Sequence, residues 1–177
     1  MASCLLATRP LVGQGLHLAV SGGIAFQAGN DTVSSHGPTF AAALIVPVRP
    51  TVAARLEAAW HHFSNPLAGI VTAPCRLGDP CLSGSGYVTD PLTISRVTVE
   101  LLSHARESGL QLYLLAGGGV YRAALANRTV TSTGISAGVG IAGQRVWSGF
   151  SVEVRYHRLF GNPLCKDLLP LNLSVTF

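Results

Sequence analysis

Charged side chains are scarce in this sequence: Asp, Glu, Lys and Arg make up 11% of its 177 residues, against roughly 25% in an ordinary soluble domain. The 12 basic residues outnumber the 8 acidic ones, but Lys166 is the single lysine and the arginines are scattered rather than clustered. Scattered arginines argue against a nucleic-acid-binding surface. The low charge, together with 48% hydrophobic residues, also excludes a disordered chain and a coiled coil.

Long hydrophobic runs are also missing. The longest purely apolar run, from Phe40 to Val48, contains Pro47 and falls well short of the ~18 residues that a transmembrane helix requires. The charge-free segment 10–30 is interrupted by polar residues and by the Gly22-Gly23 pair, which weakens a helix. An apolar chain without apolar helices has one other way to span a bilayer, the closed β-barrel, because only helices and closed barrels satisfy every backbone polar group in lipid.

A two-residue alternation of apolar with polar or small side chains recurs along most of the sequence, and this is the primary signal of a β-strand. It is clearest in the segment 169–177, where Leu, Val or Phe occupies every odd position and Pro, Asn, Ser or Thr every even one. Only an extended chain sorts residues between two faces in this way. The pattern predicts eight strands, at about 16–27, 40–48, 52–61, 92–101, 110–120, 135–141, 150–157 and 169–177.

One predicted strand has an inconsistent alternation. Leu92 and Ile94 share their parity with the polar face of the strand rather than with its apolar face, which begins at Val97. A β-bulge inserts one extra residue and shifts the parity of everything beyond it. We therefore expect a bulge near Ser95.

The predicted connections alternate in length. Short turns fall at 49–50, 104–109 and 143–145, and longer loops at 28–38, 64–91, 122–132 and 159–167. In an antiparallel barrel all short turns would then lie at one end and all long loops at the other, which is the layout of outer-membrane barrels. We predict an all-β, eight-stranded antiparallel up-and-down transmembrane β-barrel, formed by residues 15–177 as a single domain after an N-terminal segment 1–14.

The composition of the two strand faces indicates which one is enclosed. One face is almost wholly Leu, Val, Ile, Ala and Phe, and in water it would form a patch far larger than soluble monomers tolerate. The other face carries small residues with three arginines and three glutamates, and matched charges suit an interior where an unpaired charge is costly. We expect the apolar face to point outward. A soluble, lipocalin-like ligand-binding barrel, with the two faces reversed, is the alternative.

The enclosed charges are predicted to pair inside the barrel, where they form the candidate site. They are Arg55, Glu57, Arg96, Glu100, Glu153 and Arg155. Because the interior of an eight-stranded barrel is only wide enough for side chains, we expect an ion-pair network that fills the lumen and prevents diffusion through it. A narrow or gated channel for small solutes is the alternative.

Aromatic residues are predicted to lie near both ends of the strands, as in the interfacial girdles of membrane barrels. At the long-loop end these are Phe26, Phe40, Trp60, Phe63, Tyr156 and Phe160, and at the short-turn end Trp147 and Phe177.

Residues that could carry chemistry are few. No nucleophile motif, phosphate-binding loop or metal-spaced cluster occurs, and Gly117 to Gly119 lie within a strand pattern rather than between a strand and a helix. We therefore predict no enzymatic activity, no cofactor and no metal. Cys75 and Cys81 lie in the longest predicted loop, where Pro and Gly residues would allow a small disulfide typical of an oxidising compartment; two unpaired thiols are the other interpretation.

The strand pattern and the end of the chain resemble the small outer-membrane β-barrel proteins of Gram-negative bacteria, the eight-stranded class of outer membrane protein A, outer membrane protein X and OmpW-like proteins. The final strand is similar to that family's C-terminal assembly signal. The resemblance implies that the barrel-assembly machinery recognises its apolar face, which consists of Leu169, Leu171, Leu173, Val175 and Phe177.

The same resemblance implies a location in the bacterial outer membrane, in contact with its lipid. Because recognition usually resides in loops on a rigid scaffold, we expect a structural or adhesive surface protein or a partner anchor, which binds an extracellular ligand of unknown identity through loop 64–91. The scattered arginines predict no nucleic-acid partner. The family is exported by a signal peptide, whereas Met1 to Pro10 lack a full apolar core segment. We interpret the segment 1–14 as the remnant of an export signal.

Overall fold

The computed structural model describes residues 15–28, 35–64, 91–104, 110–143 and 149–177. These residues form eight β-strands, and none of them belongs to a helix long and apolar enough to span a membrane. The strands are β1 (His17–Ala28), β2 (Ser35–Arg49), β3 (Val52–Phe63), β4 (Leu92–His104), β5 (Gln111–Leu125), β6 (Arg128–Ala142), β7 (Gly149–Phe160) and β8 (Asp167–Thr176).

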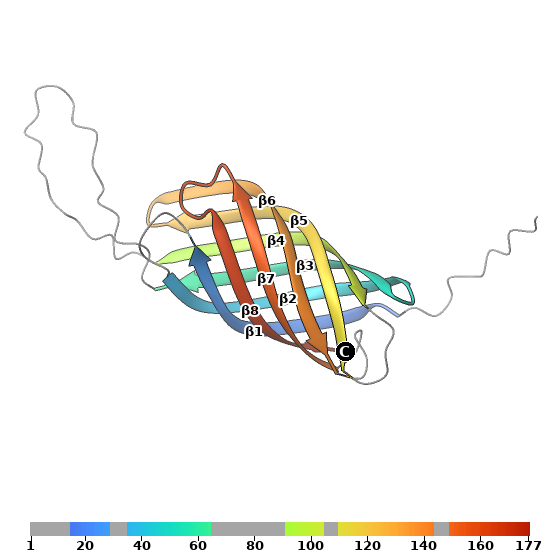
Figure 1. The fold of residues 1–177 in the computed structure, drawn as a ribbon. Helices are drawn as coiled ribbons and strands as arrows, with labels where there is room; N and C mark the ends of the chain where they lie inside the picture. Colours follow the sequence, from blue (N-terminus) through green and yellow to red (C-terminus); the bar gives the residue numbers. More distant parts are fainter. Residues whose placement is uncertain (1–14, 29–34, 65–90, 105–109, 144–148) are drawn as a thin grey trace, which may run out of the picture.

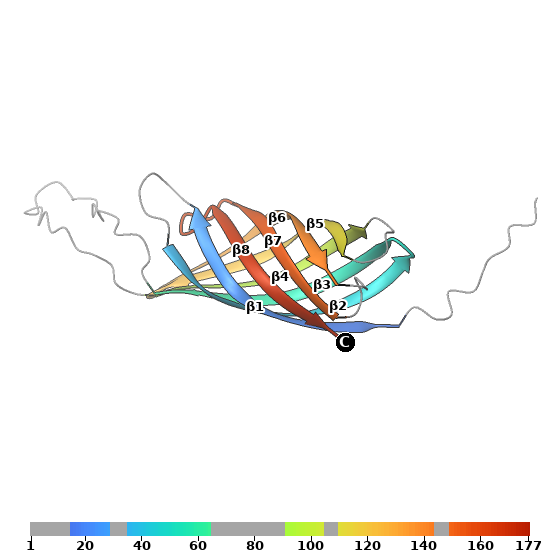
Figure 2. The same cartoon turned by 60° about the horizontal axis from the view of Figure 1, so that its bottom comes forward.

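Each strand pairs antiparallel with the next, and β8 pairs with β1 to close the barrel (Figure 1). The closing pair runs from Ala19 opposite Thr176 to Ala28 opposite Asp167. In both views the strands run obliquely around the barrel (Figure 2). Closure leaves no strand edge unpaired, and the predicted eight-stranded antiparallel barrel is confirmed.

The apolar face of the barrel points outward. Leu112, Val152 and Leu171 are 55%, 48% and 43% exposed, whereas Arg55 and Glu153 are each 3% exposed. Large exposed apolar side chains occur on all eight strands. A lipocalin-like barrel would require the reverse arrangement, so the soluble alternative is wrong for this chain.

The bulge expected near Ser95 is absent, because the pairing of β4 with both of its neighbours is continuous from Leu92 to Ser103. Leu92 and Ile94 point into the barrel and are 1% and 0% exposed. The prediction failed because it assumed that every enclosed position is polar. The one register shift between β2 and β3 lies instead between Pro47 and Arg49.

The long loop expected at 122–132 is also wrong. β5 ends at Leu125, β6 begins at Arg128, and only two residues connect them, of which Ala126 has a positive φ of 48°. The threonines of this region, Thr129, Thr131 and Thr133, are exposed strand residues. Threonine favours strands, and here the two strands continue beyond their apolar portion, where an apolar–polar alternation no longer marks them.

Close backbone approach explains why glycine occurs at position 117 of β5. A Cβ at Gly117 would lie 2.1 Å from the backbone oxygen of Val99 on β4. A Cβ at Gly22 on the outer face would meet nothing nearer than 3.8 Å. The barrel wall therefore tolerates a side chain at the second position but not at the first.

We expect Gly117→Ala to destabilise the barrel by about 1–3 kcal/mol, the usual cost of overpacking, and Gly22→Ala to change stability little. The measurement is the fraction of refolded protein that migrates in the compact form on an unboiled gel across a urea series. Equal midpoints for the two variants would contradict the close approach of β4 and β5.

Candidate functional site

The six predicted lumen residues come from three strands and all point inward. Arg55 and Glu57 lie on β3, Arg96 and Glu100 on β4, and Glu153 and Arg155 on β7. Within each strand the two residues are separated by an even number of positions, which places both on the same face. None of the six is more than 3% exposed.

Arg155 contacts all three glutamates. Its Nη1 lies 2.6 Å from Oε1 of Glu57 and 3.6 Å from Oε2 of Glu100, and its Nη2 forms a close ion pair with Oε2 of Glu153. β7 thus connects to carboxylates on β3 and β4.

Arg55 makes a second connection across the lumen. Its Nη2 lies 2.5 Å from Oε2 of Glu100, and its Nη1 lies 2.8 Å from Oε1 of Glu153. Arg96 completes the set with an Nη2 to Oε1 distance of 2.6 Å to Glu57. Three positive and three negative side chains therefore balance, as burial of charge requires.

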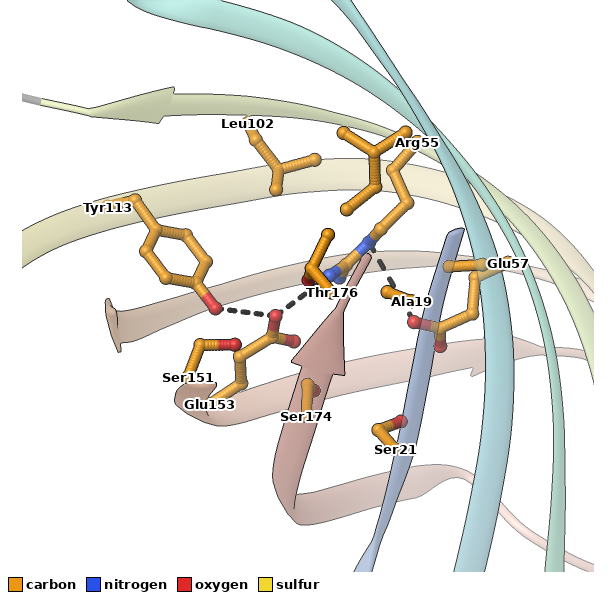
Figure 3. Close-up of a pocket in the computed structure, with 12 residues that line it drawn as sticks. Ala19, Ser21, Arg55, Glu57, Leu102, Tyr113, Ser151, Glu153, Ser174 and Thr176 are labelled. Carbon is orange, nitrogen blue, oxygen red and sulfur yellow. Dashed lines mark hydrogen bonds and ion pairs between the residues drawn. The ribbon is translucent and has the colours of Figure 1, made fainter. Parts of the chain in front are cut away.

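Uncharged hydroxyl groups also donate hydrogen bonds to the glutamate carboxylates. The hydroxyl of Tyr113 donates a hydrogen bond of 2.5 Å to Oε1 of Glu153, and Ser136 donates one of 3.0 Å to Oε1 of Glu100. Figure 3 shows Tyr113 and Arg55 both directed at Glu153. A buried polar network stabilises a structure only when its members find partners in this way.

Two histidines extend the polar layer. Arg96 donates from Nε to Nε2 of His61 at 3.1 Å, and because arginine has no acceptor, the proton of this imidazole must lie on Nδ1. Nδ1 of His157 lies 2.8 Å from the hydroxyl of Tyr121. Among the described residues, no three His, Cys, Asp or Glu side chains are grouped so as to hold a metal ion.

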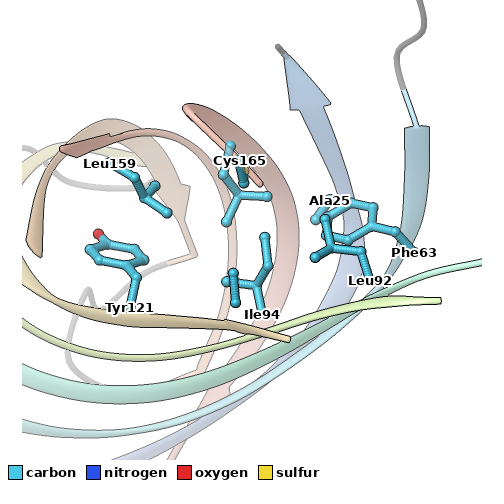
Figure 4. Packing of buried hydrophobic residues seen from close by; sticks show 9 residues of the cluster. Ala25, Phe63, Leu92, Ile94, Tyr121, Leu159 and Cys165 are labelled. Carbon is cyan, nitrogen blue, oxygen red and sulfur yellow. The ribbon is translucent and has the colours of Figure 1, made fainter. Parts of the chain in front are cut away.

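Apolar layers lie beyond the charged layer at both ends. Figure 4 shows the long-loop layer, in which Phe63, Leu92 and Ile94 are packed together with residues of β5, β7 and β8. Phe63 is 0% exposed, so its predicted place in an outer aromatic girdle is wrong. Leu102, Tyr113, Leu115 and Ala142 form a cluster toward the short-turn end.

A small cavity lies in the lumen beside Arg55, Glu57 and Glu153 (Figure 3). Its volume is about 10 Å³, which is close to the room needed for one water molecule. This cavity is too small for a solute.

The predicted C-terminal signal lies on the outer face of β8, where Leu169, Leu171 and Leu173 are 39%, 43% and 56% exposed. Val175 is half-buried on the same face. Phe177 follows β8 and is joined to β1, since its backbone N–H donates to the oxygen of Leu18 at 2.8 Å. The strand that carries these residues therefore forms one side of the closing seam.

Other predicted features lie outside the described residues. These are Cys75, Cys81, Trp147, the segment 1–14 and nearly all of loop 64–91. Cys165 is described and is a free, buried cysteine in the β7–β8 connection. Burial raises the pKa of its thiol to about 12, so it carries almost no reactive thiolate at neutral pH.

Sequence reasoning missed the hydroxyl partners of the network. The two-residue alternation places Tyr113 and Ser136 on the enclosed face, but nothing in their spacing indicates that they contact a glutamate. A signal did exist for Tyr113, because a Tyr enclosed among small residues needs a partner for its hydroxyl.

No protein-family model and no curated protein sequence matches this chain. Solved structures do match. Neisserial surface protein A (NspA) aligns with a TM-score of 0.59 and 14% identity over 91% of this chain and 95% of that one. Ail, the attachment invasion locus protein of Yersinia pestis, solved with the heparin analogue sucrose octasulfate, aligns with a TM-score of 0.54 and 14% identity over 92% and 99%.

A third structure, of the Yersinia pestis outer membrane protein Ail in a phospholipid bilayer nanodisc, aligns with a TM-score of 0.51 and 14% identity over 92% of this chain and 100% of that one. This chain has the fold of the small eight-stranded outer-membrane barrels. At 14% identity the similarity shows the fold alone.

We expect Glu57→Gln to lower the free energy of unfolding by about 3–5 kcal/mol, because it leaves three buried arginines, Arg55, Arg96 and Arg155, short of one carboxylate. The matched control is Asp167→Asn, which removes the partner of Arg158 in an exposed ion pair. Such pairs contribute little. Urea unfolding in micelles, followed by tryptophan fluorescence, measures both; equal losses would contradict a stabilising network at Glu57.

Proposed function

We propose that this protein is an integral β-barrel of the bacterial outer membrane that serves as a closed scaffold for its surface loops, and is neither a diffusion porin nor an enzyme. The observation that carries the proposal is the network of ion pairs that three arginines and three glutamates form across the lumen. A barrel filled in this way offers no route for solutes through its lumen. Its outer wall and its loops are then the surfaces through which it can bind lipid or other molecules.

The outer wall supports insertion into a bilayer. Apolar side chains cover it on every strand, and aromatic rings gather toward the long-loop end. Phe40 and Trp60 stack at 6.2 Å between ring centroids, and Trp60 stacks on His62 at 5.4 Å. Trp beside polar rings is typical of the membrane–water interface.

We expect the purified protein to need detergent for solubility and to migrate differently on a gel before and after boiling, because the closed barrel resists unfolding until heated. Circular dichroism before and after boiling should show loss of the β signal in step with the change in migration. A protein that stays monomeric and folded in plain buffer would overturn the membrane assignment.

We expect no large stable conductance in planar bilayers from the wild-type protein, and none from Glu100→Ala, because the apolar layers around Phe63 and Leu102 also close the lumen. Single-channel recording measures this, with a porin of known conductance as the positive control. Open steps from Glu100→Ala alone would favour the alternative of a narrow or gated channel. Large steps from the wild type would overturn the closed scaffold.

The proposal includes two binding partners, the barrel-assembly machinery and an extracellular ligand. We infer that the barrel-assembly machinery recognises the apolar face of β8, from Leu169 to Phe177, and that loop 64–91 binds an extracellular ligand as an adhesive or anchoring surface. The position of β8 at the closing seam supports the first inference. Support for the second is the rigid scaffold, since recognition usually resides in loops that such a scaffold positions.

A further inference from the structure

Two histidines lie inside the barrel, next to the apolar layer of the long-loop end. His61 on β3 and His157 on β7 are both 0% exposed. Two positions farther along the same inward faces come Phe63 and Leu159, which belong to that apolar layer (Figure 4). The other histidines of the chain are partly or fully exposed, namely His17, His36, His62 and His104. The lumen therefore controls the protonation of His61 and His157 alone.

His61 is neutral in the closed barrel because its Nε2 accepts the hydrogen bond of 3.1 Å from Nε of Arg96, and an imidazolium has no acceptor. A proton on Nε2 would remove this hydrogen bond and place a second cation against the guanidinium group. Nδ1 of His61 has no hydrogen-bond partner among the described residues. The protonated ring would therefore hold two buried N–H donors without partners, which is costly.

A proton on His157 would also lack compensation. Its Nδ1 lies 2.8 Å from the hydroxyl of Tyr121, and its Nε2 has no hydrogen-bond partner in the described part of the chain. A hydroxyl can accept from an imidazolium, but it carries no charge that would neutralise it. Within the same described residues, neither imidazole forms an ion pair with a carboxylate.

The charges around the two imidazoles are already balanced. Inside this part of the lumen the described residues of β1, β2, β6 and β8 supply uncharged side chains, such as Thr39, Ser136 and Asn172. The titratable groups of β5 are the hydroxyls of Tyr113 and Tyr121, which stay protonated where histidine titrates. An added proton on either histidine thus leaves an uncompensated positive charge in an enclosed layer. The charged side chains of β3, β4 and β7 are three arginines and three glutamates, namely Arg55, Glu57, Arg96, Glu100, Glu153 and Arg155.

We propose that His61 and His157 form an acid-sensitive lock on the closed barrel, which holds the polar layer together at neutral pH and weakens it in mild acid. An unfolded chain takes up a proton on each imidazole below about pH 6.5, whereas the closed barrel excludes both protons. Protons therefore favour the unfolded chain, and the stability of the barrel falls as the pH falls below this value.

The test measures the equilibrium constant for unfolding of the full chain in urea and neutral detergent, between about pH 7.5 and about pH 5. This range includes the titration of free histidine and ends above that of free glutamate, near pH 4.3. Tryptophan fluorescence and migration on an unboiled gel both report unfolding.

The variants are His61→Gln, His157→Gln and the double variant. Glutamine suits position 61 because its side-chain oxygen is a neutral acceptor for Arg96. The matched control is His62→Gln, which removes the neighbouring histidine of β3. The ring of His62 lies on the outer face and stacks on Trp60, so it can ionise in the folded and the unfolded chain alike.

Across this pH range we expect acid to raise the unfolding constant about thirtyfold for each histidine that the barrel keeps neutral. The rise is then about a thousandfold in the wild type and in His62→Gln, and about thirtyfold in each single variant of the lock. The double variant should change little. A wild-type constant that stays level would overturn the lock, and so would a double variant that keeps the full rise.

Failure of this proposal can be told apart from failure of the proposed function. Every variant is first checked at neutral pH for different migration before and after boiling, which reports the closed barrel and not its response to acid. If His61→Gln does not fold, the comparison of His157→Gln with the wild type still decides. A heat-modifiable barrel that shows no response to acid would refute the lock and leave the closed scaffold intact.

Discussion

The structure depends on the requirement that charge taken out of water must find charge of the opposite sign. Three arginines and three glutamates occupy the middle of the lumen, and each carboxylate contacts at least two guanidinium groups. Because the strands that carry them are joined by hydrogen bonds around a closed ring, the wall holds the backbones of the partners close to one another. The network and the barrel therefore specify one another.

The apolar layers above and below the charges follow from the same requirement. Toward each end of the lumen the chain places Leu, Ile, Phe and Ala instead of further ion pairs. These side chains limit the access of water to the charged layer, and low water content strengthens each electrostatic contact. The lumen is thus packed with apolar side chains toward its ends, like the core of a soluble protein, and with ion pairs in its middle.

Much of this arrangement could be predicted from the sequence. In β3 the charged Arg55 and Glu57 alternate with apolar residues, so parity alone assigns them to the enclosed face. Parity could not show which arginine meets which glutamate, because that depends on how far the strands are staggered around the barrel. Parity also misassigned Leu92 and Ile94, because the enclosed face is itself apolar at these positions. It ended β5 too early, because exposed residues near the end of that strand, such as Arg122, are polar.

The seam between β1 and β8 joins the two strands that lie farthest apart along the chain, from Ala19 paired with Thr176 to Ala28 paired with Asp167. Contacts of such large sequence separation carry the highest entropic cost and form late. Until they form, both strands expose backbone donors and acceptors that lipid cannot satisfy. A half-closed sheet is therefore unfavourable in the bilayer, and this cost favours a pathway in which insertion and closure of the barrel are coupled.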